Sequence, residues 1–571
     1  MSENHDPNMR IGSVIGGGLK ENLHVRLSVP PEEVQEGSFI VIESGDWQFY
    51  GIATDLQLQS TDPRFAFESS HKRLPAEIAN LLDKQTLYTN LVVLPALMLE
   101  RGPDPASPAY QAWLAAIDAN QKEEPRPMPV KSIPGHHAAV RLAGAGDVAE
   151  IFGKPGAEGN FIIGHTREQG HPVCVNLDQL ILRSAGIFGA TGSGKSFLTR
   201  ILLAGLVERN RASVLVYDMH NEYGLDDTAS DTGQNVRGLR SAFGASRVQV
   251  VGLGASASIR GQSPDFTLSL ACTDILPEDV ELLTRELNLK ETTATVLDAL
   301  RQDFRDQWFQ SFKAMRRGAT IEEDGKKVPA PDSVAAWANE MGVNIMAAEG
   351  LHDKLRRLFN RPYIMETPPK DSIKALIEAL LAGKHIVLSF GDHQSDLDYL
   401  LISNLLTRRI RAEWEKMTDA FRGQNGPEPR QLLIVLEEAH KLLNREMAAQ
   451  TTFSTIAREM RKYYVTLLVV DQRPSQIYDE VMSQLGTRVC GWLGDEEDIH
   501  AALSGLAGRE ALRGMLSRLQ PKQEVLLLGW GVPMPILLRS RRYDEQFWQE
   551  IRTARKAGLD QAQVIKTLYP D

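Results

Sequence analysis

Cysteine is scarce in this chain. Only Cys174, Cys272 and Cys490 occur among its 571 residues. They lie far apart and form no CxxC pair, so the sequence offers neither a zinc ribbon nor a disulfide framework. We expect all three to be small buried thiols.

Long hydrophobic runs are also missing. No apolar stretch reaches the roughly 20 residues that a membrane-spanning helix needs. The N-terminal segment MSENHDPNMR is polar and acidic, unlike the charged and then apolar start of a secretion signal. We therefore expect a cytoplasmic protein that does not associate with a membrane.

The sequence has no excess of basic residues. Its 63 Lys and Arg stand against 74 Asp and Glu, which gives a formal net charge of −11. This balance argues against a surface that binds nucleic acid everywhere. It does not exclude a ring with a basic inner wall and an acidic outer wall, because net charge averages over surfaces that act separately. The length predicts roughly three or four domains.

Residues 1–150 are predicted to form a small all-β module. Short alternating runs at Leu23–Val29, Phe39–Ile42 and Trp47–Ala53 are separated by proline and glycine turns. A proline-rich excursion follows at residues 102–134. The strand-like run Ala138–Leu142 then returns to the module.

The central region is predicted to be an α/β domain with a mostly parallel sheet that is covered on both faces. Buried strands of continuous apolar residues alternate there with helices, which is typical of such a sheet. The runs are Ser213–Tyr217, Val248–Val251, His385–Phe390, Leu432–Leu436 and Val465–Val470. We assign residues 151–264 and 369–505 to this domain, residues 265–368 to a helical insertion, and residues 506–571 to a C-terminal extension.

A phosphate-binding loop lies inside the α/β domain. Its residues match the pattern GxxxxGK[ST] at every fixed position, and an apolar run before it and a helical run after it give the required strand–loop–helix context. They are Gly189, Ala190, Thr191, Gly192, Ser193, Gly194, Lys195 and Ser196. Backbone N–H groups and the helix N-terminus would hold phosphates. Lys195 is expected at the β- and γ-phosphates, and Ser196 at magnesium. The pattern predicts a site for ATP with Mg²⁺.

A buried strand that ends in two carboxylates is the expected partner of this loop. Leu432–Leu436 is followed by Glu437 and Glu438. Adjacent strand residues point in opposite directions, so the two glutamates can have different tasks. We expect Glu437 to act in the magnesium shell, through water, and Glu438 to polarise the attacking water. A strand that merely exits into an acidic turn is the alternative.

Polar residues also surround the next strand. Arg458 and Arg461 precede the run Val465–Val470, and Gln472 follows it. Gln472 can sense a γ-phosphate, and an arginine can stabilise a transition state in its own subunit or in a neighbour. A solvated helix face is the alternative for the two arginines.

Together these segments resemble the HerA branch of the HerA/FtsK ATPases. The motifs GATGSGKS, VYDMHNEY, LEEAH, IAREMRK and QRPS occur in the order of that family. The N-terminal β-module is similar to the β-barrel of HerA proteins, and the insertion and C-terminal extension fit the same plan. The resemblance implies a RecA-like P-loop ATPase fold over essentially the whole chain.

The resemblance also implies residue roles and an assembly. It implies a homohexameric ring that encircles double-stranded DNA and translocates along it with ATP. By position, Glu438 matches the catalytic glutamate, Gln472 the sensor, and Arg461 the arginine supplied to a neighbouring subunit, with Arg458 second. Glu437 departs from the aspartate that many relatives place there. Asp471 replaces a residue that is usually small.

HerA proteins typically act with a partner. The resemblance implies a NurA-type nuclease as the partner in repair, or an antiviral effector such as a sirtuin-type NAD hydrolase or another nuclease. This chain has no nuclease cluster of its own that could stand in for the partner. The excursion at 102–134 is either a docking surface or a tolerated surface loop.

Three functions remain open at this stage. The first is a DNA translocase or helicase that serves a nuclease or effector. The second is a ring scaffold that switches on an effector without moving along DNA. The third, a conjugation or segregation pump, is disfavoured because no membrane span is predicted. Candidate DNA contacts are Arg237, Arg240, Lys313, Arg316 and Arg317, although a solvated helix face is the stronger interpretation for the last three.

Overall fold

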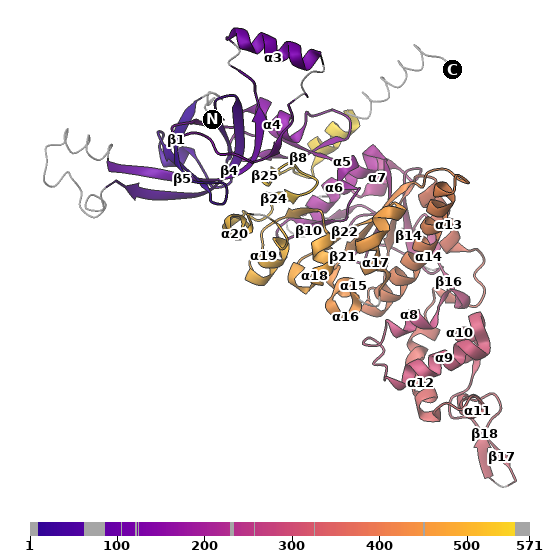
Figure 1. Ribbon diagram of the computed structural model, residues 1–571. Coiled ribbons are helices and arrows are strands. Elements are labelled where there is room, and N and C mark those ends of the chain that lie inside the picture. Colours follow the sequence, from indigo (N-terminus) through magenta and orange to yellow (C-terminus); the bar gives the residue numbers. More distant parts are fainter. Residues whose placement is uncertain are drawn as a thin grey trace, which may run out of the picture.

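The computed structural model describes residues 9–553 except 62–85, 104–105, 120–122, 124, 229–232, 234, 256, 325, 449–450 and 507. A β-barrel, a central sheet domain and a mainly helical arm follow one another along the molecule (Figure 1). Parts of the predicted N-terminal module and residues 554–571 of the predicted C-terminal extension lie outside the described residues.

The N-terminal strands close into a barrel. They are β1 (Arg10–Gly16), β2 (Leu23–Leu27), β3 (Phe39–Ser44), β4 (Trp47–Ser60), β5 (Leu87–Glu100) and β7 (Ala139–Leu142). Their order is β2-β1-β7-β3-β4-β5, and pairing of β2 with β5 closes the circle. Val25, Ile40, Leu91 and Val140 fill the interior. The alternating pattern correctly predicted a small all-β module, because one face of each strand is buried, and the barrel that the resemblance implied is confirmed.

The excursion between β5 and β7 contains helix α3 (Pro108–Asp118) and the short strand β6 (Met128–Pro129), which pairs with β5. No residue of α3 is buried, and the helix stands apart from the barrel (Figure 1). Tyr110 and Trp113 stack on each other with ring centroids 5.6 Å apart. The indole of Trp113 also covers Gly102, where an added side chain would come within 2.6 Å of it.

The central domain is built on a 12-stranded sheet. In order across the sheet, the strands are β15 (Phe266–Leu268), β14 (Val248–Leu253), β20 (His385–Ser389), β11 (Ala212–Asp218), β21 (Gln431–Glu437), β22 (Val465–Asp471), β10 (Ala185–Phe188), β23 (Thr487–Cys490), β24 (Glu524–Gly529), β25 (Ile536–Ser540), β8 (Asn160–Thr166) and β9 (Pro172–Asn176). Neighbours from β15 to β23 are parallel, and those from β23 to β9 are antiparallel.

Helices cover this sheet on both faces. Every residue of β11 and of β22 is buried, which requires packing on both sides because alternate side chains point to opposite faces. The helices are α5 (Leu177–Leu180), α6 (Lys195–Arg209), α7 (Leu239–Phe243), α13 (Ser372–Leu381), α14 (Asp396–Arg422), α15 (His440–Leu443), α16 (Arg445–Ala448), α17 (Thr452–Glu459), α18 (Asp479–Gln484), α19 (Glu496–Ala502) and α20 (Arg509–Arg518), with α4 (Ala145–Phe152) between barrel and sheet. The predicted RecA-like α/β fold with a mostly parallel sheet is confirmed.

Strand β22 lies between β10 and β21. The phosphate-binding loop follows β10, and the two glutamates stand at the end of β21. Because parallel strands end at the same edge of the sheet, the residues after β22 are placed between the loop and the acidic pair. This order of strands positions the site.

The arm between β15 and β20 is mainly helical, as the periodicity predicted. Its helices are α8 (Pro277–Glu281), α9 (Thr292–Phe304), α10 (Trp308–Ala314), α11 (Val334–Glu340) and α12 (Ile345–Phe359). Two strand pairs were not predicted: β16 (Leu270–Ala271) with β19 (Ile364–Met365) at the base, and β17 (Thr320–Glu323) with β18 (Lys326–Pro329) at the tip. The tip hairpin was missed because its residues are polar and mostly exposed, so no apolar alternation marks it.

Strands of the C-terminal region belong to the same sheet as the phosphate-binding loop. β24 and β25 follow β23 in the sheet, and the barrel rests against their side of the domain. Arg167 donates to the backbone carbonyl of Glu36 at 2.9 Å, and Ser38 donates to Glu168 at 2.9 Å. No helix in the described part of the chain is both long enough and apolar enough to cross a membrane.

Candidate nucleotide-binding site

Glycines shape the loop between β10 and α6. Gly192 and Gly194 have φ of 78° and 93°, in the left-handed region that a side chain disfavours. A side chain on Gly189 would come within 2.4 Å of the Ser193 hydroxyl. Helix α6 begins at Lys195 without a side-chain cap, so its first N–H groups remain available to a ligand. The loop therefore presents N–H groups and a helix N-terminus to one point, as the sequence predicted.

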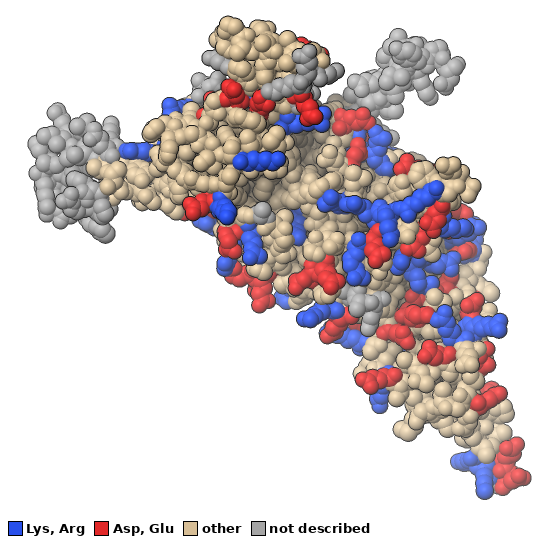
Figure 2. Space-filling view, in the orientation of Figure 1, with Lys and Arg blue, Asp and Glu red and all other residues tan. Residues whose placement is uncertain are grey.

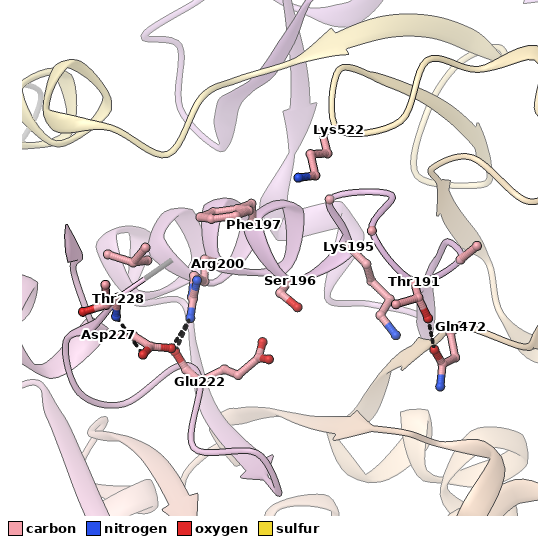
Figure 3. A pocket seen from close by; sticks show the side chains of 14 residues that line it. Thr191, Lys195, Ser196, Phe197, Arg200, Glu222, Asp227, Thr228, Gln472 and Lys522 are labelled. Carbon is pink, nitrogen blue, oxygen red and sulfur yellow. Dashed lines mark hydrogen bonds and ion pairs between the residues drawn. The ribbon is translucent and has the colours of Figure 1, made fainter. Parts of the chain in front are cut away.

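A cavity of about 470 Å³ opens beside this loop. Its lining is Ala190, Thr191, Gly192, Gly194, Lys195, Ser196, Phe197, Arg200, Glu222, Asp227, Thr228, Val236, Gln472 and Lys522. Figure 3 shows Ser196 and Glu222 directed toward the same space, with Lys195 and Thr191 on the other side of it. The cavity therefore contains a lysine for the phosphates, and hydroxyl and carboxylate groups for a metal ion.

Four polar side chains from three segments form one chain of contacts. The Nζ atom of Lys195 lies 3.9 Å from Oε1 of Glu438. Gln472 donates from Nε2 to Oε2 of Glu438 at 3.3 Å, and Thr191 donates to Oε1 of Gln472 at 2.8 Å. The structure therefore brings the predicted lysine, glutamate and glutamine together at the mouth of the loop.

Glu437 and Glu438 point to different places. Glu438 has a φ of 46°, which turns its side chain out of the strand direction and toward Lys195. Glu437 is the last residue of β21, is 5% exposed, and accepts a hydrogen bond from the hydroxyl of Tyr223 at 2.8 Å. The divergence that the sequence predicted for adjacent strand residues is present.

A second group of carboxylates surrounds Glu437. Asp218 ends β11 and accepts the backbone N–H groups of Glu222 and Tyr223 at 2.7 and 2.9 Å. Burial raises the pKa of Glu437 well above its ordinary value, and the charges of Asp218 and Glu222 raise it further. Among the described residues, Oε2 of Glu222 and Oε2 of Glu437 are buried without a hydrogen-bond partner.

These unpartnered oxygens fit a hard cation. Magnesium prefers carboxylate, hydroxyl and water oxygens, and here the hydroxyl of Ser196 and the carboxylate of Glu222 line the same cavity. Glu437 is absent from the lining residues. Glu222, which the sequence did not single out, therefore lines the same cavity as Ser196, and Glu437 does not.

Asp471 stabilises the turn that carries Glu438. It is fully buried and accepts the backbone N–H groups of His440 and Arg473, at 2.7 and 2.8 Å. The Nδ1 atom of His440 lies 3.0 Å from the same carboxylate. Burial lowers the pKa of His440, but the hydrogen bond to Asp471 and the charges of Asp471 and Glu438 outweigh burial and raise it overall.

Neither Arg458 nor Arg461 lines this cavity. Arg461 precedes β22 while Gln472 follows it, and seven strand residues span about 20 Å. Arg461 borders a separate cavity with Arg183 and Trp530, at the opposite edge of the sheet. Arg458 forms an ion pair with Glu480 at 3.5 Å.

The candidate DNA-binding arginines are paired with acidic residues. Arg237 lies 3.4 Å from Glu545, Arg240 is 2.8 Å from Asp265, and Arg316 is 2.6 Å from Asp332. Arg317 pairs with Asp353, and Lys313 lies in the last turn of α10. Figure 2 shows positive and negative side chains interspersed over the visible face of the sheet domain and the arm.

Sequence reasoning did not single out Glu222, Asp471 or Lys522 for a role. Glu222 belongs to the motif VYDMHNEY, so its position after a buried strand was the available signal. Lys522 gave no signal, because it reaches the loop from a distant segment, where its backbone N–H donates to the carbonyl of Ser193 at 2.8 Å.

The chain is similar to several known proteins. A family model described as "Helicase HerA, central domain" matches residues 161–410. The DNA double-strand break repair helicase HerA of Sulfurisphaera tokodaii is 23% identical over 544 residues, covering 94% of each chain. That of Pyrococcus furiosus is 22% identical over 392 residues, covering 65% of this chain and 67% of the relative. The bacterial conjugative coupling protein TrwB aligns with a TM-score of 0.45 and 15% identity over 70% of this chain and 92% of its own.

Replacing Asp471 by asparagine tests its structural role. Two buried N–H groups and His440 would lose a charged acceptor, so we expect a loss of roughly 2–4 kcal/mol of stability and slower nucleotide turnover, because the turn bearing Glu438 is released. Thermal unfolding and turnover measure the two effects, with the exposed Asp419→Asn as the matched control.

The contact between His440 and Asp471 predicts that the stability of the protein depends on pH. Because the pKa of His440 is raised in the folded protein, its contribution to stability is complete below the unfolded value of about 6.5 and is lost as pH rises through the folded value. Asp471→Asn should flatten this part of the stability profile. An unchanged profile would contradict the assignment of the pair.

Proposed function

Because this chain belongs to the HerA family of P-loop ATPases, we propose that it is an ATP-driven motor that moves along double-stranded DNA as a ring of six copies. The observation that carries this proposal is the contact chain Lys195–Glu438–Gln472–Thr191. It connects the phosphate-binding loop to the residues that follow β21 and β22, so a nucleotide bound at the loop can change the position of both.

The residues of the site divide the work of hydrolysis. Lys195 and the N–H groups of the loop hold the phosphates. Ser196 would hold magnesium, with Glu222 at the same cavity and Glu437 as a carboxylate that acts through water. Bound magnesium would offset the negative charge of the phosphates. Glu438 orients and deprotonates the attacking water, which its contact with Lys195 places at the phosphate end of the cavity.

Gln472 is the residue that reports the γ-phosphate to the rest of the domain. It accepts from Thr191 and donates to Glu438, so a phosphate that attracts Thr191 or Glu438 changes both contacts of Gln472. Since Gln472 directly follows β22, a shift there moves a strand buried along its whole length.

A neighbouring subunit completes the site in this proposal. Arg461 lies at the opposite edge of the sheet from the cavity, too far to reach the phosphates of its own chain, and Arg458 pairs with Glu480. In a head-to-tail ring that edge can face the cavity of the next copy, and an arginine there would stabilise charge in the transition state. Arg461 is our first choice and Arg458 the second.

The competing function is a ring scaffold in which ATP controls the assembly and activity of a partner enzyme, such as a NurA-type nuclease or a sirtuin-type NAD hydrolase. Helix α3 supports the idea that the protein binds a partner. It carries Tyr110, Trp113, Leu114 and Ile117 without burying any of them, on an excursion from the barrel. The scaffold needs the same ATPase site, so movement on DNA separates the two functions.

Glu438→Gln should bind ATP normally. Its rate of hydrolysis should fall by about 100-fold or more, because the glutamine cannot accept the proton of the water. Lys195→Ala should lose nucleotide binding as well as turnover. Calorimetric binding and phosphate release measure the two effects. Unaltered turnover in Glu438→Gln would show that the water is activated elsewhere.

Mixed rings test the arginine. Subunits with Arg461→Ala and subunits with Lys195→Ala should each be inactive alone. A ring that contains both should recover part of its turnover, because an intact loop then meets an intact arginine from its neighbour. Arg458→Ala mixed in the same way is the matched comparison. If no mixing ratio restores turnover with either arginine variant, the role between subunits is wrong.

DNA dependence tests the motor itself. With ATP and duplex DNA, mass photometry should find a species near six times the 63.4 kDa chain mass, and DNA should raise turnover several-fold. A ring whose turnover ignores DNA, and that activates its partner enzyme even as Glu438→Gln, would favour the scaffold instead.

A further inference from the structure

A tight turn lies between the phosphate-binding loop and the barrel. It runs from Arg518, the last residue of α20, to Glu524, the first residue of β24, and we call it the connecting turn. Resting on the proposed function, which places a nucleotide at the loop, we propose that the connecting turn regulates the barrel. Nucleotide at the loop makes the barrel segment before β3 more rigid, and a partner bound to the barrel changes nucleotide affinity in return.

The connecting turn is closed by its own hydrogen bonds. The N–H of Gln520 donates to Oε2 of Glu524 at 2.9 Å, and the N–H of Glu524 donates to the carbonyl of Gln520 at 3.0 Å. Glu524 is only 2% exposed, so its carboxylate depends on these protein contacts rather than on water. Lys522 stands at the tip with a φ of 65°. The turn is therefore expected to move as one unit.

The tip of the turn holds one peptide unit of the phosphate-binding loop. The N–H of Lys522 donates to the carbonyl of Ser193 at 2.8 Å, and Figure 3 shows Lys522 beside the loop. That carbonyl belongs to the same planar peptide unit as the N–H of Gly194, and Gly194 lines the nucleotide cavity. A phosphate that attracts this N–H would turn the whole peptide unit, including the carbonyl that Lys522 holds.

The loop and the tip are in direct backbone contact. A side chain on Gly194 would lie 3.0 Å from the Cα atom of Lys522. No flexible side chain stands between the two backbones at this point, so a displacement of the loop passes directly to the turn.

Two arginines connect the turn to the barrel. The Nε atom of Arg167 lies 3.1 Å from Oε1 of Glu524, and its Nη1 donates to the backbone carbonyl of Glu36 at 2.9 Å. At the other end of the turn, Nη2 of Arg518 lies 3.0 Å from Oε1 of Glu36. Both ends of the turn therefore act on Glu36, which lies between β2 and β3 of the barrel.

The barrel segment around Glu36 is itself packed against the sheet domain. Ser38 is fully buried and donates to Glu168 at 2.9 Å. A side chain on Gly37 would come within 3.1 Å of Leu537 in β25. Because these contacts form a continuous path from loop to barrel, a change at one end is expected at the other, and such coupling between two binding sites is reciprocal.

Hydrogen–deuterium exchange of the full chain, with and without ADP and Mg²⁺, tests the connection. Nucleotide should slow exchange in the phosphate-binding loop and also in the barrel segment 34–40. We expect the barrel segment to slow by about 5-fold or more, the lower end of the coupling usually found between two sites. In the double variant Arg167→Ala with Arg518→Ala, the loop should still respond to ADP and the barrel segment should not.

A second variant guards against misfolding. Loss of Arg167 alone leaves the carboxylate of Glu524 buried without its cation, so adding Glu524→Gln removes that charge while keeping an acceptor for Gln520. This triple variant should lose the barrel response in the same way. Arg101→Ala is the matched control, because it removes a barrel arginine that pairs with Glu150 on α4 instead. It should keep both responses.

The proposal is wrong if ADP slows exchange in the loop of the unaltered chain but leaves segment 34–40 unchanged. It is also wrong if the barrel segment still responds in both the double and the triple variant. No response at the loop itself would contradict the nucleotide site, and the connection would fail with it. The motor is tested separately by DNA-dependent turnover, which can be absent while the barrel response remains.

Discussion

The buried carboxylate of Asp471 holds in place the two turns that bring Glu438 and Gln472 to the phosphate-binding loop. It lies at the end of β22 and accepts from His440, which follows β21, and from Arg473, which follows β22. Burying a carboxylate raises the free energy of the folded state unless the carboxylate is hydrogen-bonded. Loss of these contacts would therefore destabilise the protein. Glu438 and Gln472 each stand next to one of the bonded residues, and their mutual contact is a consequence.

Local patterns were sufficient for part of this site. The loop from Gly189 to Ser196 could be predicted because its spacing and its flanking strand and helix are local in sequence. The central strands could be predicted because burial on both faces leaves continuous apolar runs. Glu438 could be predicted because it follows such a run directly. In each case the information lies within a few residues of the feature.

Other features depend on contacts between distant segments. The pairing of β2 with β5, which closes the barrel, joins runs that are far apart in the chain. Lys522 reaches the loop from more than 300 residues away and belongs to no motif. The role of Asp471 depends on β21 and β22 being neighbours, and the turn after β11 brings Glu222 to the cavity that Ser196 lines. Sequence periodicity carries none of this information.

The base of the helical arm has a mechanical consequence. The chain enters and leaves the arm through the paired segments Leu270–Ala271 and Ile364–Met365, and α8 is tied to α14 by the contact of Asp279 with Arg408 at 2.8 Å. The hairpin of β17 and β18 stands at the far end (Figure 1). The arm is therefore a lever with a narrow fulcrum beside the sheet, and a small tilt at the fulcrum becomes a much larger displacement at the tip.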